Sequence, residues 1–173
     1  MRRAADWISR SSKFAGEELH LPRRGQGFTL IELMVVVAIL AILIGLAAPA
    51  FRDLILNQRV KNASFDVFAS LVMARSEAIT RNTNVWICSN SGVEWKDGWT
   101  VKTTDCAGTT IRAQDSYPNV SITGPASLSY NGMGRLTGAA TISLTATGVS
   151  VANSRCIDIN ASGRPVTKTG TCP

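Results

Sequence analysis

Residues 23–51 read RRGQGFTLIELMVVVAILAILIGLAAPAF, and this stretch decides how the chain is organised. From Leu33 to Phe51 there are 19 consecutive uncharged residues, enough helix at about 1.5 Å per residue to cross about 30 Å of hydrocarbon. One acid, Glu32, stands at the start of this apolar run. A carboxylate in hydrocarbon costs about 2.5 to 3.5 kcal/mol on insertion scales, so an acid at this place needs a physical reason.

Basic residues precede the apolar run. Arg23 and Arg24 lie just before it, and four more basic residues lie further upstream. By the positive-inside rule this bias predicts a cytoplasmic N-terminus and an outward-facing C-terminal part. The alternative is a secretory signal with an Ala-x-Ala-like cut near residues 48–50. A run longer than the about 7 to 15 apolar residues of such a signal, followed by AAPAFRDL with helical periodicity, favours a retained membrane span.

The charge and the chemical inventory of the remaining chain exclude several function classes. The net charge of the 173 residues is +6, but residues 1–27 carry six basic and three acidic groups, which leaves +3 beyond Gly27. This excess is too small to indicate nucleic-acid binding by bulk charge. The one histidine, His20, lies before Gly27, and there is no Gly-x-Ser-x-Gly, phosphate-loop or paired-carboxylate pattern. We therefore predict no catalytic residues, no metal and no cofactor.

The string Gly27-Phe28-Thr29-Leu30-Ile31-Glu32, followed at once by the apolar run, resembles the start of type IV prepilins. The resemblance implies that a prepilin peptidase and N-methyltransferase of the inner membrane cuts between Gly27 and Phe28 and methylates the new amine of Phe28. Residues 1–27 would then be a cytoplasmic leader. Glycine suits a scissile position because it has no side chain to obstruct the enzyme. A leader of 27 residues is long for this class, which either a true long leader or a wrongly assigned start codon explains.

The same resemblance gives Glu32 a role in filament assembly, as the fifth residue of the mature chain. Its carboxylate would meet the N-terminal amine of a neighbouring subunit, so that two charges that are each costly in the membrane compensate one another. The alternative is that Glu32 sits at headgroup level without a function. The resemblance also names the partners that we expect: other pilins or pseudopilins, the peptidase and the lipid of the inner membrane.

Helical periodicity continues beyond Phe51, and no Gly or Pro occurs between residues 52 and 81. One apolar face recurs at intervals of three and four residues and is expected to pack on the chain's own domain. A second stripe lies alongside it and is either offered to packed neighbours or part of the same core. Pro49 removes one backbone hydrogen bond and is expected to bend or locally melt the helix. The first face comprises Leu56, Val60, Ala63, Val67, Leu71, Ala74 and Ala78, and the second Phe65, Phe68, Val72 and Ile79.

After residue 82 the composition changes to short runs of Thr, Val, Ser, Gly and Ile that predict strands. Turn signals such as Ser91-Gly92, Asp97-Gly98, Asn131-Gly132 and Ser162-Gly163 separate them. The predicted strands cover residues 85–88, 99–102, 110–113, 120–123, 128–130, 141–144, 149–151, 156–160 and 166–168. The expected fold class is α+β, of the type IV pilin kind: a long N-terminal helix packed on an antiparallel sheet or a pair of sheets. The expected parts are a leader (1–27), a transmembrane segment (28–51), a periplasmic half of the same helix (52–81) and a β-rich domain (82–173).

Four cysteines lie in this domain without C-x-x-C spacing, so zinc is not expected. In an oxidising periplasm they predict two disulfides, and proximity in sequence favours Cys88 with Cys106 and Cys156 with Cys172, although four cysteines allow three pairings. Each bridge would close a loop, and the lower chain entropy of the unfolded state would stabilise the fold by about 3 kcal/mol. Trp86, Trp95 and Trp99 lie close together in sequence. Core packing explains such a group better than ligand stacking does.

Four segments of the mature chain resemble the H-type pseudopilins of type II secretion and the FimT/FimU minor pilins. They are MARSEAITRNTNV (73–85), Asp97-Gly98-Trp99, SYNGMGRL (129–136) and RCIDINASGRP (155–165). The resemblance implies a structural subunit of a type IV pilus or a secretion pseudopilus that primes or tips the filament, and it implies no enzyme. It places the chain in the inner membrane, with a cytoplasmic N-terminus and a periplasmic domain, and then in the filament.

The alternative function is DNA binding during natural transformation. In FimT-type proteins a C-terminal Gly-Arg-x-Arg element is associated with DNA capture. Gly163 and Arg164 match it here, but Val166 replaces the second arginine, and Lys168 follows two positions later. Arg164 and Lys168 would neutralise two phosphates and give weak, salt-sensitive binding, with Arg135 as a weaker candidate. A solvated surface loop is the competing and preferred interpretation.

Overall fold

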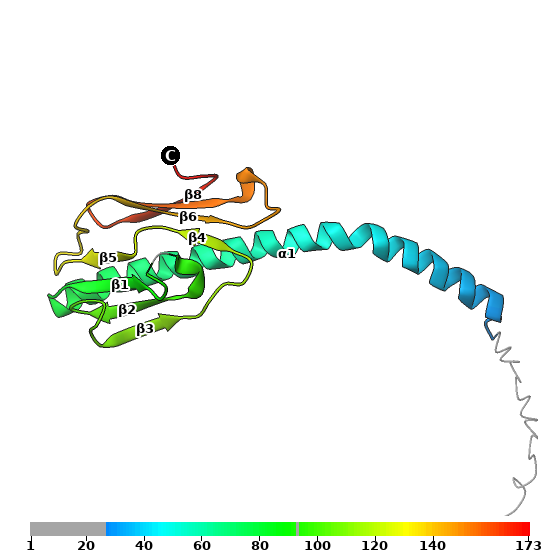
Figure 1. The fold of residues 1–173 in the computed structure, drawn as a ribbon, viewed down its shortest axis with the longest axis horizontal. Helices are drawn as coiled ribbons and strands as arrows, with labels where there is room; N and C mark the ends of the chain where they lie inside the picture. The colour runs from blue at the N-terminus through cyan, green and yellow to red at the C-terminus, as the bar shows by residue number, and fades with distance from the viewer. Residues whose placement is uncertain (1–26, 93) are drawn as a thin grey trace, which may run out of the picture. The chain divides into compact units, whose positions relative to one another are not determined.

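The computed structural model describes residues 27–92 and 94–173, so residues 1–26 of the expected leader lie outside the described part. The chain divides into two compact units, Met1–Ala41 and Ile42–Pro173. The first unit contributes the start of helix α1 (Leu30–Arg81), and the second contains the rest of α1 and every strand among the described residues. Figure 1 shows the order of the elements along the chain.

Helix α1 continues through Pro49 to Arg81, and no Gly or Pro occurs between residues 52 and 81 to interrupt its second half. Asn82 then adopts a left-handed φ of 50°. The amide of Thr83 donates to the carbonyl of Ala78 at 3.2 Å and that of Asn82 to the carbonyl of Ile79 at 3.3 Å, which closes the helix as a Schellman motif does. Position 49 lies inside α1 without a break in the helix, so the expected local melting is not observed, while a bend at Pro49 stays a prediction.

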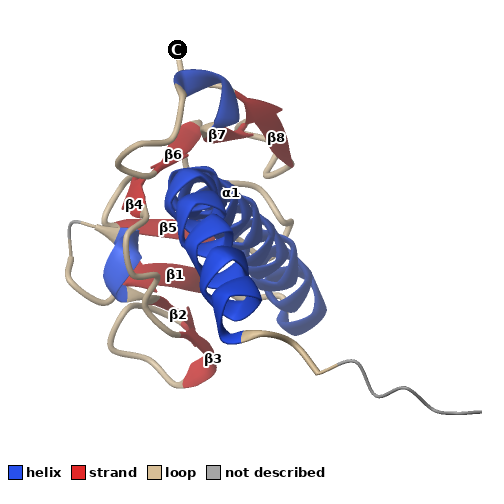
Figure 2. Cartoon of the chain, turned by 90° about the vertical axis from the view of Figure 1, so that its right-hand side faces the viewer, coloured by secondary structure: helices blue, strands red, loops and turns tan. Residues whose placement is uncertain are grey.

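The strands form two antiparallel four-stranded sheets. The first has the order β3-β2-β1-β5 and the second the order β4-β6-β7-β8. Figure 2 shows the strands in an arc along one side of α1, from β3 through β1 and β5 to β6 and β8. The strands of the first sheet are β1 (Val85–Ser89), β2 (Trp99–Thr103), β3 (Thr110–Gln114) and β5 (Ser127–Tyr130), and those of the second are β4 (Ser121–Thr123), β6 (Ala140–Thr145), β7 (Arg155–Ile159) and β8 (Pro165–Thr169).

Eight of the nine predicted strands match these elements, and the prediction for residues 149–151 is wrong. The amide of Val149 donates to the carbonyl of Ala146 in a turn, and Gly148 has a φ of 88°. A short 3-10 helix, η2 (Val151–Asn153), follows. Residues 149–151 therefore lead from a turn into a short helix, because the backbone reverses at Gly148 before a strand can extend.

The predicted inner face of α1 is confirmed. All seven of its residues are buried, and they form one core with the inward side chains of both sheets. Trp95, in the short helix η1 (Trp95–Asp97), and Trp99 belong to this core, with ring centroids 5.8 Å apart. Core packing is therefore the role of these two tryptophans, and Trp86 on β1 is half-buried.

Two disulfides hold the domain, with the pairing that sequence proximity favours. Cys88 is joined to Cys106, and Cys156 to Cys172. The first bridge fastens the loop after β2 to β1, and the second fastens the C-terminal residues to β7. Each closes a loop of 16 to 18 residues, so each restricts the unfolded chain and supports a small core.

Candidate functional site

The predicted cleavage position lies in an exposed segment outside the helix. Gly27, Phe28 and Thr29 precede α1, and a Cβ atom built at Gly27 would meet nothing within 4 Å. The side chain of Phe28 is 79% exposed. A peptide bond in this setting is open to an enzyme, and cleavage and methylation there stay predictions.

Glu32 lies in the first turn of α1, and its amide donates to the Oγ1 atom of Thr29 at 3.2 Å. Thr29 is thus the N-cap of the helix and Glu32 its third residue, the Thr-x-x-Glu spacing of a capping box. A carboxylate at this end also faces the positive end of the helix dipole. The helix start therefore reduces the cost of this acid before any partner arrives.

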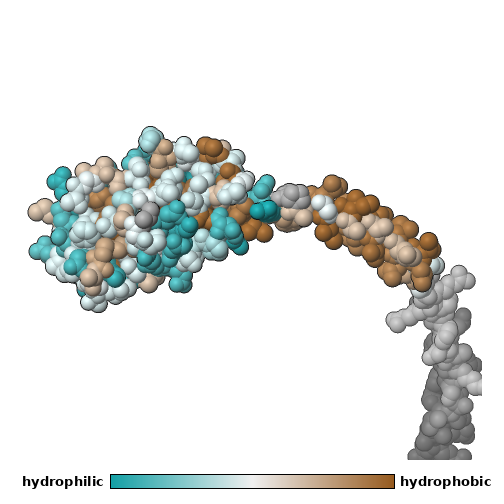
Figure 3. All heavy atoms as spheres, in the orientation of Figure 1, coloured by the Kyte–Doolittle hydropathy of each residue, from teal (hydrophilic) through white to brown (hydrophobic). Residues whose placement is uncertain are grey.

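The surface of α1 is apolar far beyond what a helix of a water-soluble domain exposes. The helix is long and apolar enough to cross a membrane, and none of its most apolar 18-residue window is buried. The N-terminal part of the helix in Figure 3 is coloured almost wholly as hydrophobic. Within the second unit, the predicted second stripe stays largely outside the core: Phe65 is 70%, Val72 45% and Ile79 48% exposed, while Phe68 is half-buried. We call Phe65, Val72 and Ile79 the outer stripe.

A half-buried polar contact joins α1 to the loop before β4. The hydroxyl of Tyr117 donates to the carboxylate of Asp66, and the Tyr117 ring stacks on Trp99 with centroids 6.0 Å apart. Burial and the contact with Asp66 raise the pKa of Tyr117 far above its ordinary value. The Nε1 of Trp99 donates to Ser70 at 3.0 Å. Ser70 therefore anchors β2 of the first sheet to the helix, and Asp66 anchors the loop before β4.

Two loops pack on each other near the last turns of α1. One holds Gly134 and the other holds Gly163. The Nε of Arg75 donates to the carbonyl of Gly134 at 2.9 Å. Gly163, with a φ of 78°, lies against that same carbonyl, and a Cβ atom there would approach the Tyr130 ring to 2.9 Å. A glycine is required at this crossing. Burial raises the pKa of Tyr130 to about 12, and the nearby Arg75 lowers it in part.

The residues proposed for DNA lie on and beside the edge strand of the second sheet. Arg164 is exposed just before β8, and its amide donates to the Oδ1 of Asn160 at 3.3 Å. Lys168 on β8 forms an ion pair with Asp158 on β7 at 3.0 Å. Arg135 is exposed beside Gly134. Because Asp158 shares the charge of Lys168, Arg164 is the freer cation of the predicted pair, and DNA binding stays a prediction.

Some of these features have a sequence signal and others have none. The Thr29 cap has a sequence signal, the spacing Thr-x-x-Glu. The prepilin resemblance accounts for Glu32 through filament assembly and says nothing of a cap. The Asp66–Tyr117 contact joins residues 51 positions apart, and no local pattern announces it. Within the described residues, no group of three or more His, Cys, Asp or Glu side chains is placed to hold a metal ion.

Two regions of the chain match models of known protein families. Residues 64–163 match the family model described as type II transport protein GspH. The chain belongs to the GspH family. The N-terminal stretch, residues 22–48, matches the prokaryotic N-terminal methylation motif. The GspH family consists of structural pilin and pseudopilin subunits, and the methylation motif with its apolar helix fits a membrane-anchored member of that family.

Solved structures support the fold of this GspH-family chain. It is similar to two crystal forms of the type IV minor pilin FimU of Pseudomonas aeruginosa. One has 20% sequence identity and a TM-score of 0.56, over 62% of this chain and 91% of FimU. The other has 19% identity and a TM-score of 0.58, over 64% of this chain and 89% of FimU. The expected type IV pilin fold, a long helix with two antiparallel sheets, is thereby confirmed. No curated protein sequence matches the chain.

Proposed function

We propose that this chain is a minor subunit of a type IV pilus or a type II secretion pseudopilus, and that it primes or tips the filament. Membership of the GspH family supports the subunit role. The single observation that carries the proposal is the 52-residue helix, whose C-terminal half packs one face into its own domain while the large apolar side chains from Leu30 to Leu46 in its N-terminal half stay exposed. Such a surface is stable only in lipid or against other subunits.

In this proposal the helix starts in the inner membrane with a cytoplasmic N-terminus and a periplasmic domain. The peptidase cuts between Gly27 and Phe28 and methylates Phe28. The carboxylate of Glu32, already held at the capped helix start by Thr29, then meets the amine of a neighbouring subunit. Two charges that are costly in lipid compensate one another, which favours docking.

The variant Glu32→Leu tests this assembly step. We expect the variant to be processed to a mass that begins at N-methylated Phe28, but to be largely lost from sheared filaments, because it has no anion for the neighbour's amine. Asp53→Leu is the matched control, since Asp53 is an exposed acid on the same helix just beyond the apolar run. If the processed Glu32→Leu chain enters filaments as readily as Asp53→Leu, the electrostatic docking step is wrong.

A further inference from the structure

A groove lies beside α1 in the second unit. Its volume is about 820 Å³. One wall is the helix from Ala48 to Arg59, and the other consists of the loop before β4, the segment around η1 and Thr147. All of these residues belong to the unit Ile42–Pro173.

The lining of the groove combines apolar side chains with cations. We call the apolar lining residues of the helix, Ala48, Phe51, Ile55 and Leu56, the apolar floor, and Phe51 and Ile55 are 62% and 51% exposed. Three cations, Arg52, Arg59 and Lys96, line the groove, and Glu94 is the one carboxylate among the described lining residues. Apolar side chains beside cations fit an amphipathic anion better than a free ion.

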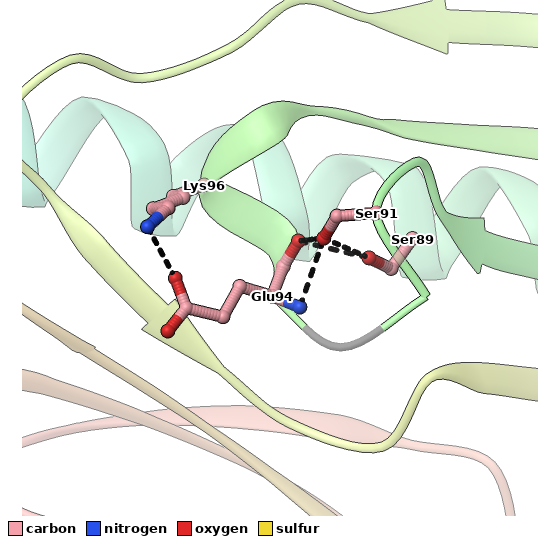
Figure 4. A network of polar contacts seen from close by, with 4 residues as sticks. All are labelled: Ser89, Ser91, Glu94 and Lys96. Carbon is pink, nitrogen blue, oxygen red and sulfur yellow. Dashed lines mark hydrogen bonds and ion pairs between the residues drawn. The ribbon is translucent and has the colours of Figure 1, made fainter.

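The carboxylate in the groove is already occupied. Glu94 forms an ion pair with Lys96 at 2.8 Å, and this contact raises the pKa of Lys96. Ser89 and Ser91 donate to the Glu94 carbonyl at 2.8 and 2.7 Å, which holds the segment in place (Figure 4). Arg52 and Arg59 form no ion pair with any residue that the structure describes, so they are the cations of the groove that are open to an anion.

The two arginines are arranged along one side of the helix. They are seven positions apart, which is close to two turns and about 10 Å along the axis. Arg59 also donates from Nη1 to the carbonyl of Pro118 at 3.4 Å, so that its guanidinium stays on the groove wall. Guanidinium groups bind phosphate oxygens in a bidentate manner.

The place of the groove's helix residues in the sequence indicates where the bound anion would be found. Arg52 is the first charged residue after the 19-residue apolar run. The hydrocarbon of a bilayer ends where such a run ends, and phosphate headgroups begin there. We propose that the groove binds the headgroup of an anionic phospholipid, with the phosphate between Arg52 and Arg59 and the start of an acyl chain on Phe51 and Ile55. This proposal rests on the membrane anchoring proposed above.

Native mass spectrometry of the detergent-solubilised full chain tests the site. Phosphatidylglycerol and phosphatidylcholine with the same acyl chains are added separately. We expect phosphatidylglycerol adducts to be strongly preferred, and Arg52→Gln and Arg59→Gln each to weaken them about fivefold, the equivalent of about 1 kcal/mol per basic residue at an anionic surface. Arg59→Lys should keep the preference for phosphatidylglycerol but bind it more weakly than the unchanged chain does, because an ammonium group cannot bind the phosphate in a bidentate manner. Lys61→Gln is the matched control, an exposed cation on the same helix that does not line the groove.

Three outcomes would overturn the proposal. The first is equal binding of both lipids, and the second is a Lys61→Gln effect as large as that of Arg59→Gln. The third is displacement of the lipid by inorganic phosphate, which would make the groove an ion site without a role for its apolar floor. Flotation with phosphatidylcholine liposomes separates the two proposals, because an anchored chain floats whether or not its groove selects a headgroup.

Discussion

At the scale of single residues, the two tyrosines of the chain report directly on its packing. Both are held in the protonated form: Tyr117 by burial and by its contact with Asp66, and Tyr130 by burial. Burial favours the neutral phenol, so each pKa lies above the ordinary value of about 10. The stability that depends on these pKa values is fully present below about pH 10 and is lost as the pH rises above it, because the unfolded chain then releases protons that the folded chain retains.

Absorbance at 295 nm across alkaline pH measures this effect. The folded chain in detergent should show no tyrosinate step near pH 10, and the first step, from Tyr130, should come near a pH of about 12. In denaturant both tyrosines should titrate near pH 10. A full step near pH 10 in the folded chain would contradict the burial of Tyr130 and the contact of the half-buried Tyr117 with Asp66.

Tyr117→Phe tests the contact between α1 and the loop before β4. The variant keeps the ring that stacks on Trp99 but leaves the Asp66 carboxylate without the hydroxyl. Hydrogen bonds to charged groups contribute about 1.5 to 3 kcal/mol, so we expect the free energy of unfolding to fall by about 1 to 3 kcal/mol in urea titrations.

Tyr130→Phe is the matched control for that variant. The Tyr130 hydroxyl is buried without a hydrogen-bond partner among the described residues. Its removal should leave the stability unchanged or raise it, since an unpaired buried polar group is costly. Equal losses in the two variants would show that the Asp66 contact does not stabilise the fold.

At the scale of elements, the two faces of α1 make opposite predictions for neighbouring residues. Leu71 is fully buried, while Val72 on the outer stripe is 45% exposed. Leu71→Ala should lower the free energy of unfolding by about 2 to 5 kcal/mol, because it leaves a cavity in the core. Val72→Ala should change it by no more than about 0.5 kcal/mol and should instead reduce the recovery of the chain in filaments. A Val72→Ala variant as unstable as Leu71→Ala would place the outer stripe inside the core.

The same elements show what the sequence could and could not reveal. The inner face of α1 was readable because a helix repeats every 3.6 residues and seven apolar residues keep that period. Most strands were readable from their composition and from the turn residues between them. The division into two sheets was not, because the pairing of β4 with β6, or of β1 with β5, joins segments that are distant in sequence. The groove was missed for the same reason, since its walls come from residues 48–59, 94–96, 119–121 and 147.

At the scale of the whole molecule, the buried core of the described chain begins at Leu56. Residues 54–173 therefore contain every buried apolar side chain of the described part and both disulfides. This fragment should fold without detergent, and the absence of a tyrosinate step near pH 10 would verify its packing. It should therefore supply a form without the apolar segment, in which the loops that hold Arg135 and Arg164 can be tested for DNA binding.

Gel shifts of this fragment across a salt series test the predicted pair Arg164 and Lys168. Two phosphate contacts allow a fall in affinity of no more than about tenfold between 50 and 200 mM salt. We therefore expect no retardation at 200 mM and at most weak retardation at 50 mM. Arg164→Ala should reduce any binding more than Lys168→Ala, because Asp158 already shares the charge of Lys168, and Lys61→Ala is the control for net charge. A steeper salt dependence would require further cations such as Arg135, and binding that is indifferent to Arg164→Ala would remove this loop from any role in holding DNA.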